Sequence, residues 1–336
     1  MKTPSPAEGQ PAPPLIVIVG PTAIGKTALG VRLAETFRGE IVSADSRQVY
    51  IGMDIGTAKA TSEERTRAHH HLVDVVDPDQ VLTLAQYQES ALAVVDDVLS
   101  RQCVPFLVGG TGQYVMAVVE GWQVPRVPPD ENLRRELYRE AEENGPDGLH
   151  ERLSGLDSVA AARIDSRNVR RVVRALEVCI KTGQPISEQQ GKSPPPYRIL
   201  ILGLTAPRPW LYKRIDQRIE DMLAAGLENE VRGLLAAGYG FHLPAMSGVG
   251  YGQFAAFLGG TAGLDDVVRD IKRVTRRFVR QQGSWFGGDD PRIQWLDARE
   301  DPYSPAAALV RAFLGGEAPG ECAPTPDADP AWERGP

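Results

Sequence analysis

The segment that most constrains this 336-residue chain is the octapeptide GPTAIGKT at residues 20–27. It fits the pattern G-x-x-x-x-G-K-[ST], and it lies between a short apolar run, LIVIV, and a stretch of helical periodicity from Lys26 to Phe37. In such a strand–loop–helix unit, backbone N–H groups surround an anion at the N-terminus of the helix. The sequence therefore predicts a loop that binds a di- or triphosphate, made of Gly20, Pro21, Thr22, Ala23, Ile24, Gly25, Lys26 and Thr27.

The last two residues of this loop carry its chemistry. Lys26 is expected to contact the phosphates, and the Thr27 hydroxyl is expected to bind Mg²⁺. By its motif alone the loop is also an ATP-binding loop, so the pattern indicates a di- or triphosphate without saying which molecule carries it. A tight turn with a coincidental lysine is the alternative interpretation.

Further short apolar runs alternate with helical stretches along the chain. The runs are EIVSADS, HLVDVVDP, VPFLVGG, YRILILGLT and IQWLD, and one of the helical stretches extends from Leu84 to Ser100. Buried strands that alternate with helices form a mostly parallel sheet covered on both faces. We therefore expect an α/β fold with a phosphate-binding loop at the start of its core.

The domain organisation follows from interruptions of this alternation. Prolines follow VPFLVGG at residues 125, 128 and 129, and the next strand-like run is not met until Arg198. The segments between them read as helices, so we expect an all-helical insertion at 121–195 in a core made of 15–120 and 196–312. Residues 1–14 hold five prolines, and 313–336 form a tail rich in Pro, Gly, Ala and acid, so both are expected to be disordered.

The net charge of −7 argues against a protein that coats nucleic acid through bulk electrostatics. However, six cations lie between Arg163 and Lys181, and six more between Arg269 and Arg280. These segments indicate either a local site for a polyanion or two solvated helix faces. No apolar stretch is long enough to span a bilayer, and the N-terminus has no apolar run like that of a signal peptide, so we expect a cytoplasmic protein without membrane contact.

A carboxylate near the loop suggests what reaction takes place there. NTPases usually carry an Asp at the end of an apolar strand to complete the Mg²⁺ shell, but VPFLV ends in Gly109, Gly110 and Thr111, which argues against a motor ATPase or a GTPase. Asp45 ends the second strand-like run, and strand adjacency is expected to place it beside the mouth of the loop. It is a candidate to accept a proton from a nucleophile, or alternatively to cap the segment that follows.

Eight segments follow one another between about Leu15 and Asp297: GPTAIGKT, SADSRQVY, MDIGTAKA, HHLVDVVDP, VGGTGQY, NVRRVVRALEV, MLAAGLENEV and VGYGQ. Taken together in this order, the chain resembles the bacterial tRNA dimethylallyltransferases, also called tRNA isopentenyltransferases. The resemblance implies transfer of the dimethylallyl group of dimethylallyl diphosphate to the exocyclic amine of the adenine immediately 3′ of the anticodon. Pyrophosphate would leave whole, with Mg²⁺ as the cofactor.

The resemblance also implies roles for individual residues. Asp45 would be the general base, with Lys26 and Thr27 on the diphosphate. No protein partner is implied. The residues expected to contact the anticodon stem-loop of the tRNA are Asp45, Ser46, Arg47, Gln48, Thr111, Arg134, Asn168, Val169, Arg170, Arg171, Val172, Arg174, Gln253, Arg276 and Arg280.

The chain departs from the family pattern where positive charges are usual, at Ser247, Gly252, Gln281 and Gly287. A non-catalytic tRNA-binding relative is therefore one alternative. A nucleotide kinase is another, although no short arginine-flanked lid is present in the sequence. A third is an adenylate isopentenyltransferase acting on a free nucleotide, against which the long basic insertion argues.

Overall fold

The computed structural model describes residues 12–287 and 290–315. They divide into two compact units, one formed by residues 120–195 and the other by the described residues on either side. The helical insertion expected at 121–195 thus has a counterpart that begins one residue earlier.

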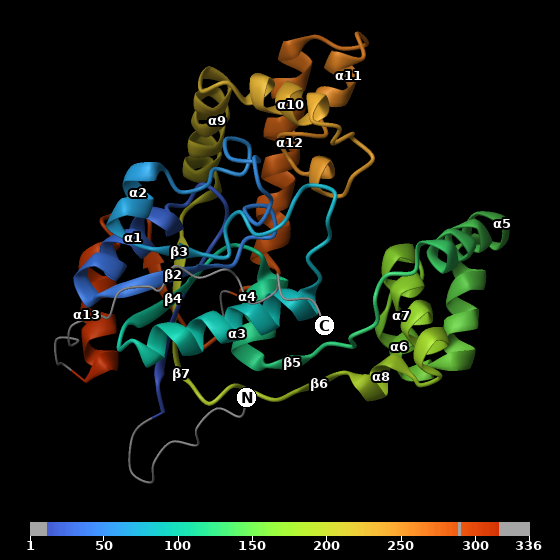
Figure 1. Cartoon of the computed structure of the whole chain (residues 1–336), viewed down its shortest axis with the longest axis horizontal. Coiled ribbons are helices and arrows are strands. Elements are labelled where there is room, and N and C mark those ends of the chain that lie inside the picture. Colours follow the sequence, from blue (N-terminus) through green and yellow to red (C-terminus); the bar gives the residue numbers. More distant parts are fainter. Residues whose placement is uncertain (1–11, 288–289, 316–336) are drawn as a thin grey trace. The chain divides into compact units, whose positions relative to one another are not determined.

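The larger unit is built on a six-stranded sheet in the order β3-β2-β4-β1-β7-β8. Figure 1 labels β3, β2, β4 and β7 of this sheet. All neighbouring strands in it are parallel. β1 is apolar along its length and wholly buried from Leu15 to Val19, as expected for a strand covered on both faces. The strands are β1 (Pro14–Val19), β2 (Gly39–Ser43), β3 (His70–His71), β4 (Val104–Val108), β7 (Arg198–Thr205) and β8 (Ile293–Asp297).

Helices cover both faces of this sheet, because the crossovers run in opposite directions. The connection from β1 to β2 passes over β4 in one direction, and the connection from β3 to β4 passes over β2 in the other, so right-handed crossovers place their helices on opposite faces. The predicted α/β fold with a mostly parallel sheet is confirmed. The helices next to the sheet are α1 (Lys26–Phe37), α2 (Ser62–Arg67), α3 (Leu84–Ser100), α4 (Gly112–Glu120) and α13 (Tyr303–Leu314).

A second group of helices lies between β7 and β8. α12 packs against α9 and α11, and α10 packs against α9 (Figure 1). No helix formed by the described residues has the length and apolar character needed to span a bilayer. The elements of this group are α9 (Arg208–Ala224), α10 (Leu227–Ala236), the 3₁₀ turn η1 (Ala245–Ser247), α11 (Phe254–Leu258) and α12 (Leu264–Gly283).

The smaller unit has its own apolar core, which includes Leu149, Val172 and Leu176. α5 is kinked at Gly145, where φ is 76° and a proline follows, so it comprises two helical segments. The unit is not purely helical, because β5 and β6 pair as a short antiparallel ladder. Its elements are β5 (Trp122–Gln123), α5 (Glu131–Leu156), α6 (Ser158–Arg163), α7 (Val169–Thr182), α8 (Ile186–Gln189) and β6 (Gly191–Lys192).

Three further expectations need correction. HLVDVVDP is not a strand: β3 ends at His71, and Leu72 and Asp74 have left-handed backbone angles that break the extended run. Residues 12–14 are ordered, since Pro14 opens β1 and Ala12 O accepts a hydrogen bond from Arg198. At the other end α13 includes residues 313 and 314. The rest of the predicted disorder, at 1–11 and 316–336, lies outside the described residues.

Candidate active site

The glycine-rich loop joins β1 to α1 at the carboxyl edge of the sheet. Gly25 precedes the helix in a left-handed conformation, with φ of 107°, which a residue with a side chain rarely adopts. Gly20 has a φ of 147°, and a Cβ on it would lie 2.8 Å from the carbonyl oxygen of Leu204 in β7. The glycines of the motif thus allow the loop to curl between β7 and the N-terminus of α1, where the helix dipole favours an anion.

Lys26 is the first residue of α1, and its Nζ donates a hydrogen bond of 2.9 Å to the carbonyl oxygen of Pro21. Burial lowers its pKa from the usual 10.5 to about 8; the Asp45 carboxylate partly opposes this shift, and Arg218 adds to it. Lys26, Asp45 and Arg218 are therefore close enough to influence one another electrostatically. A bound anion here would favour the charged form of Lys26.

Asp45 follows β2, and Thr111 follows β4, at the same edge of the sheet. β2 does not lie next to β1, because β4 separates them, so the adjacency expected for Asp45 was wrong by one strand. Thr111 Oγ1 accepts the backbone N–H of Ser46 at 3.0 Å. This bond brings together the two segments that were predicted to face the substrate.

The Asp45 carboxylate has one oxygen in use and one available. Oδ1 accepts the backbone N–H of Arg47 at 2.9 Å, which is the capping role considered as an alternative. Within the described part of the chain, Oδ2 has no hydrogen-bond partner, and the residue is half-buried. The carboxylate can therefore cap the turn with one oxygen and accept a proton with the other.

Three other predicted tRNA contacts are engaged in holding loops. Arg47 donates to the carbonyl oxygen of Pro244 at 2.8 Å, and Gln48 Nε2 donates to those of Thr57 and Ala58 at 3.3 and 3.2 Å. Gln253 Oε1 accepts the N–H of Gly250 at 2.8 Å. A contact of these side chains with tRNA stays a prediction.

Two arginines of α9 border the glycine-rich loop and were not predicted from the sequence. Arg214 Nε donates to the carbonyl oxygen of Ala23 at 3.0 Å, and Arg218 lies 3.5 Å from Thr22 Oγ1. Burial lowers the pKa of Arg218, against the opposing effect of Asp45. Their spacing of four residues on one helix was the available signal, since it places two cations on one face.

Gln282 in the last turn of α12 was also overlooked. The residue is 5% exposed, its Oε1 accepts the N–H of Thr22 at 2.9 Å, and its Nε2 donates to the carbonyl oxygen of Gly110 at 3.0 Å. A Cβ on Gly110 would lie 2.4 Å from this Nε2. One amide group therefore connects α12, the glycine-rich loop and the end of β4.

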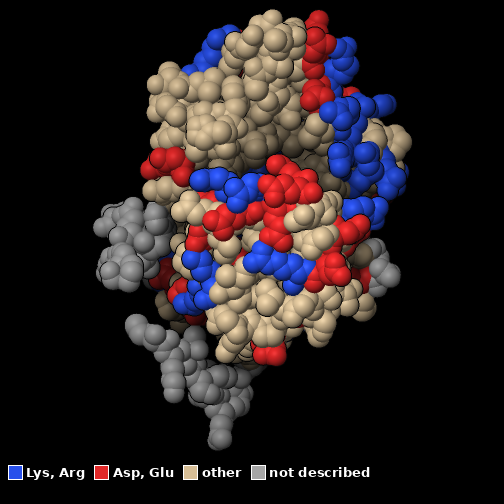
Figure 2. Space-filling view, turned by 90° about the vertical axis from the view of Figure 1, so that its right-hand side faces the viewer, with Lys and Arg blue, Asp and Glu red and all other residues tan. Residues whose placement is uncertain are grey.

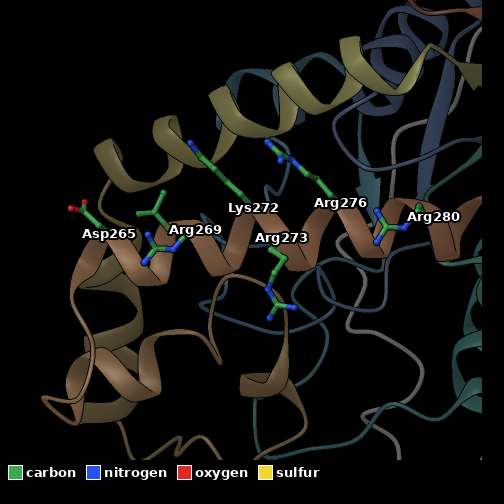
Figure 3. Close-up of a pocket in the computed structure, with 7 residues that line it drawn as sticks. Asp265, Arg269, Lys272, Arg273, Arg276 and Arg280 are labelled. Carbon is green, nitrogen blue, oxygen red and sulfur yellow. The ribbon is translucent and has the colours of Figure 1, made fainter.

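An open groove of about 510 Å³ runs along α12, with Arg269, Lys272, Arg273, Arg276 and Arg280 among its lining residues (Figure 3). Lys272 and Arg276 extend toward α9, where they pair with Glu220 at 2.9 Å and Asp216 at 2.5 Å. Arg280 is exposed and has no ion pair among the described residues. On the face in Figure 2, Lys and Arg gather along one side, whereas elsewhere they mix with Asp and Glu.

The candidates in the smaller unit fall into two groups. Arg134 and Arg174 both pair with the fully buried carboxylate of Glu177, at 2.9 and 2.6 Å. Burial raises the pKa of Glu177, but these bonds and the N–H of Asp130 outweigh it and hold the pKa below the usual value. Both arginines therefore have a structural role, whatever else they contact.

The second group lies at the start of α7. Asn168 caps the helix by accepting the N–H of Arg171 at 3.3 Å, and Val169 is the first helical residue. Arg170 and Arg171 are exposed. The side chain of Val172 is wholly buried in the core, so the prediction that it contacts tRNA is wrong.

The fold and this edge of the sheet define the class: an α/β protein with a glycine-rich loop before its first helix, a nearby carboxylate in Asp45 and no Asp at the end of the neighbouring strand β4. A family model described as IPP transferase matches residues 48–289. The chain belongs to the IPP transferase family, as its motifs indicated.

Individual proteins support this assignment. The chain is 52% identical over 302 residues to a tRNA dimethylallyltransferase of Roseiflexus sp. (strain RS-1), covering 90% of this chain and 99% of that protein. It resembles the crystal structure of the tRNA isopentenylpyrophosphate transferase of Bacillus halodurans, with 37% identity, a TM-score of 0.66, and coverage of 90% and 96% of the two chains. A structure of a eukaryotic dimethylallyltransferase acting on tRNA is 26% identical, with a TM-score of 0.77 and coverage of 93% and 82%.

Proposed function

We propose that this enzyme transfers the dimethylallyl group of dimethylallyl diphosphate to the exocyclic amine of the adenine 3′-adjacent to the anticodon of a tRNA, and releases pyrophosphate. The family and the names of its relatives support the activity. The observation that carries the proposal is the placement of Lys26 and Asp45 at one edge of the sheet, where the Asp45 carboxylate affects the pKa of the lysine. Among the described residues, Asp45 Oδ2 has no hydrogen-bond partner.

The leaving diphosphate needs positive charge near it, whereas the attacking adenine amine needs a group that accepts its proton. Negative charge develops on the diphosphate as the bond from its oxygen to the allylic carbon breaks, and the N-terminus of α1, Lys26 and Arg218 supply positive charge for it. The adenine amine loses a proton as its bond to carbon forms, and Asp45 Oδ2 would accept that proton. The adenine has to leave the stack of the anticodon loop to reach this edge.

Mg²⁺ is proposed as the cofactor, and the residues present fit it. Within residues 12–287 and 290–315, no group of three or more His, Cys, Asp or Glu side chains could hold a metal ion. Mg²⁺ keeps several water ligands and is held largely by substrate phosphates, and the Thr27 hydroxyl in the first turn of α1 would be its ligand from the glycine-rich loop. The ion would neutralise part of the charge on the diphosphate.

Removal of Mg²⁺ with EDTA is expected to weaken binding of pyrophosphate by about tenfold or more, which is a loss of at least about 1.4 kcal/mol, because the ion no longer neutralises charge on the ligand. Isothermal titration calorimetry on the parent enzyme and on Thr27→Val measures the effect. The variant should bind weakly with or without Mg²⁺. Equal affinity of the parent enzyme in both conditions would contradict the proposal.

The exposed cations Arg170 and Arg171 are proposed to contact phosphates of the tRNA. Changing both to Ala is expected to weaken tRNA binding and to reduce the slope of log K against log salt by about 0.7 to 0.9 per lost contact. Fluorescence anisotropy at several salt concentrations measures the slope. Arg167→Ala is the matched control, since this exposed arginine is paired with Asp165 at 2.7 Å. A slope unchanged in the double variant would mean that α7 only faces solvent.

One assay separates the alternatives. Pyrophosphate release is measured with dimethylallyl diphosphate plus tRNA, and again with AMP or ATP in place of tRNA. Pyrophosphate release that requires tRNA and does not occur with AMP or ATP supports the proposal. Release with AMP or ATP indicates an adenylate isopentenyltransferase. Phosphate transfer from ATP would indicate a kinase, and tRNA binding without product would indicate a non-catalytic relative.

A cytoplasmic location is proposed together with the activity, because the proposed substrate is tRNA.

A further inference from the structure

Three of the motif segments in this chain have no part in phosphate binding or in proton transfer as described above. They are MDIGTAKA at 53–60, GLENEV at 226–231 and VGYG at 249–252. In the structure all three meet at one carboxylate, that of Glu230 in α10.

The Glu230 carboxylate accepts four hydrogen bonds. Oε2 accepts the backbone N–H groups of Asp54 at 2.9 Å and Ile55 at 2.7 Å. Oε1 accepts the N–H of Gly56 at 3.1 Å and the hydroxyl of Tyr251 at 2.7 Å. Hydrogen bonds to an ionised acceptor are stronger than neutral ones, so this side chain fixes three consecutive residues of the loop to α10.

The contact between the loop and Tyr251 is tight. Tyr251 is 1% exposed, and a Cβ on Gly56 would lie 2.6 Å from its ring. The buried ammonium of Lys59 fixes the other end of the loop, by donating to the carbonyl oxygen of Tyr50 and to Asp54, both at 2.6 Å. The loop therefore has little freedom to shift while Glu230 holds it.

This loop in turn holds the segment that carries Asp45. Gln48 lies three residues after Asp45, and its amide donates to the carbonyl oxygens of Thr57 and Ala58 in the loop. Its Oε1 accepts the hydroxyl of Ser43, at the end of β2, at 3.3 Å. A continuous series of hydrogen bonds thus runs from Glu230 through the loop to the residues on both sides of Asp45.

We infer that Glu230 is a positioning residue for prenyl transfer, which sets the place of Asp45 through residues 54–58 and Gln48. This inference rests on the proposed function. A misplacement of about 1 Å in a reacting group can cost about 100-fold in rate, so a residue distant from the diphosphate can control turnover. The phosphate contacts lie on the loop before α1 and do not pass through Glu230.

The test is Glu230→Gln. The amide keeps one acceptor oxygen, but its NH₂ group would face a backbone N–H, so part of the loop is released. We expect kcat to fall by about 10- to 100-fold, with the Kd for pyrophosphate unchanged. Hydrogen exchange of residues 53–58 should become faster. Glu228→Gln is the matched control on the same helix, since within the described part of the chain Glu228 has an ion pair with Arg232 alone, and this variant should behave as the parent enzyme.

The outcomes are distinguishable. A parent enzyme that releases no pyrophosphate with tRNA contradicts the proposed function, and the exchange measurement then still tests whether Glu230 holds the loop. An active parent enzyme with full kcat in Glu230→Gln overturns the inference, as does a loss of pyrophosphate binding in proportion to rate. If Glu230→Gln does not fold, Glu230→Asp keeps the charge with a shorter reach. The same selective loss of kcat is expected for it, and full kcat would overturn the inference.

Discussion

Asp45→Asn is expected to lower kcat by about 10²- to 10⁴-fold, the usual contribution of a general base. The exocyclic amine of adenine is a poor nucleophile because its lone pair is delocalised into the ring. Loss of the proton acceptor should therefore lower the rate constant of the chemical step by this whole factor. Asn keeps an oxygen that can accept the N–H of Arg47, and the cap of the turn should survive. Single-turnover kinetics with labelled dimethylallyl diphosphate measure the rate.

The dissociation constants for tRNA and dimethylallyl diphosphate should stay within a few-fold of those of the parent enzyme. Asp79→Asn, which changes an exposed carboxylate, is a suitable control. An Asn variant that keeps most of its turnover would return Asp45 to the role of a cap. Loss of tRNA binding in proportion to rate would assign it to substrate positioning.

Lys26→Met should reduce kcat by on the order of 10²- to 10³-fold, because the contact of the ammonium with the diphosphate strengthens as charge develops on the leaving group. The change in KM should be smaller. Steady-state kinetics measure both constants. Lys213→Met is the control, since Lys213 is an exposed cation on α9. A nearly normal kcat with only a raised KM would mean that Lys26 binds the ground state and the transition state equally.

The lowered pKa of Lys26 gives this prediction a pH dependence. Only the charged form attracts the diphosphate, and in the free enzyme that form is lost as the pH rises through about 8. The affinity for pyrophosphate should therefore fall between about pH 7 and pH 9 in the parent enzyme. Lys26→Met should keep only the dependence that the ligand itself contributes. Identical pH profiles for the two proteins would contradict the lowered pKa.

Elements with strong local signals could be predicted from the sequence. The helical stretches Lys26–Phe37 and Leu84–Ser100 coincide with α1 and α3, because Gly25 and the capping residue Thr83 stop the helices from extending backward. VPFLV and IQWLD coincide with β4 and β8. The order of strands in the sheet depends on tertiary pairing, and so β4 was not expected between β1 and β2.

The candidate site was predictable only where a motif lies in one stretch of sequence. The glycine-rich loop and Asp45 are read from neighbouring residues, whereas Gln282 lies 260 residues from its partner Thr22. Arg134 and Arg174 looked like free cations, because nothing local shows that Glu177 is buried between them. The burial of Val172 has the same cause: an apolar residue beside arginines gives no indication of which side of the helix faces the core.

The short ladder between β5 and β6 has a consequence for how this enzyme can vary. Trp122 pairs with Lys192 and Gln123 with Gly191, so the point where the chain enters the smaller unit lies beside the point where it leaves. The residues between these two pairs therefore form an insertion whose two ends are hydrogen-bonded to each other. The entropy of closing a chain segment rises only slowly with its length, so the closure itself adds little cost when residues are gained or lost on the surface of this unit, outside its core. The helices between β5 and β6 can therefore vary in length while the register of the six-stranded sheet stays the same.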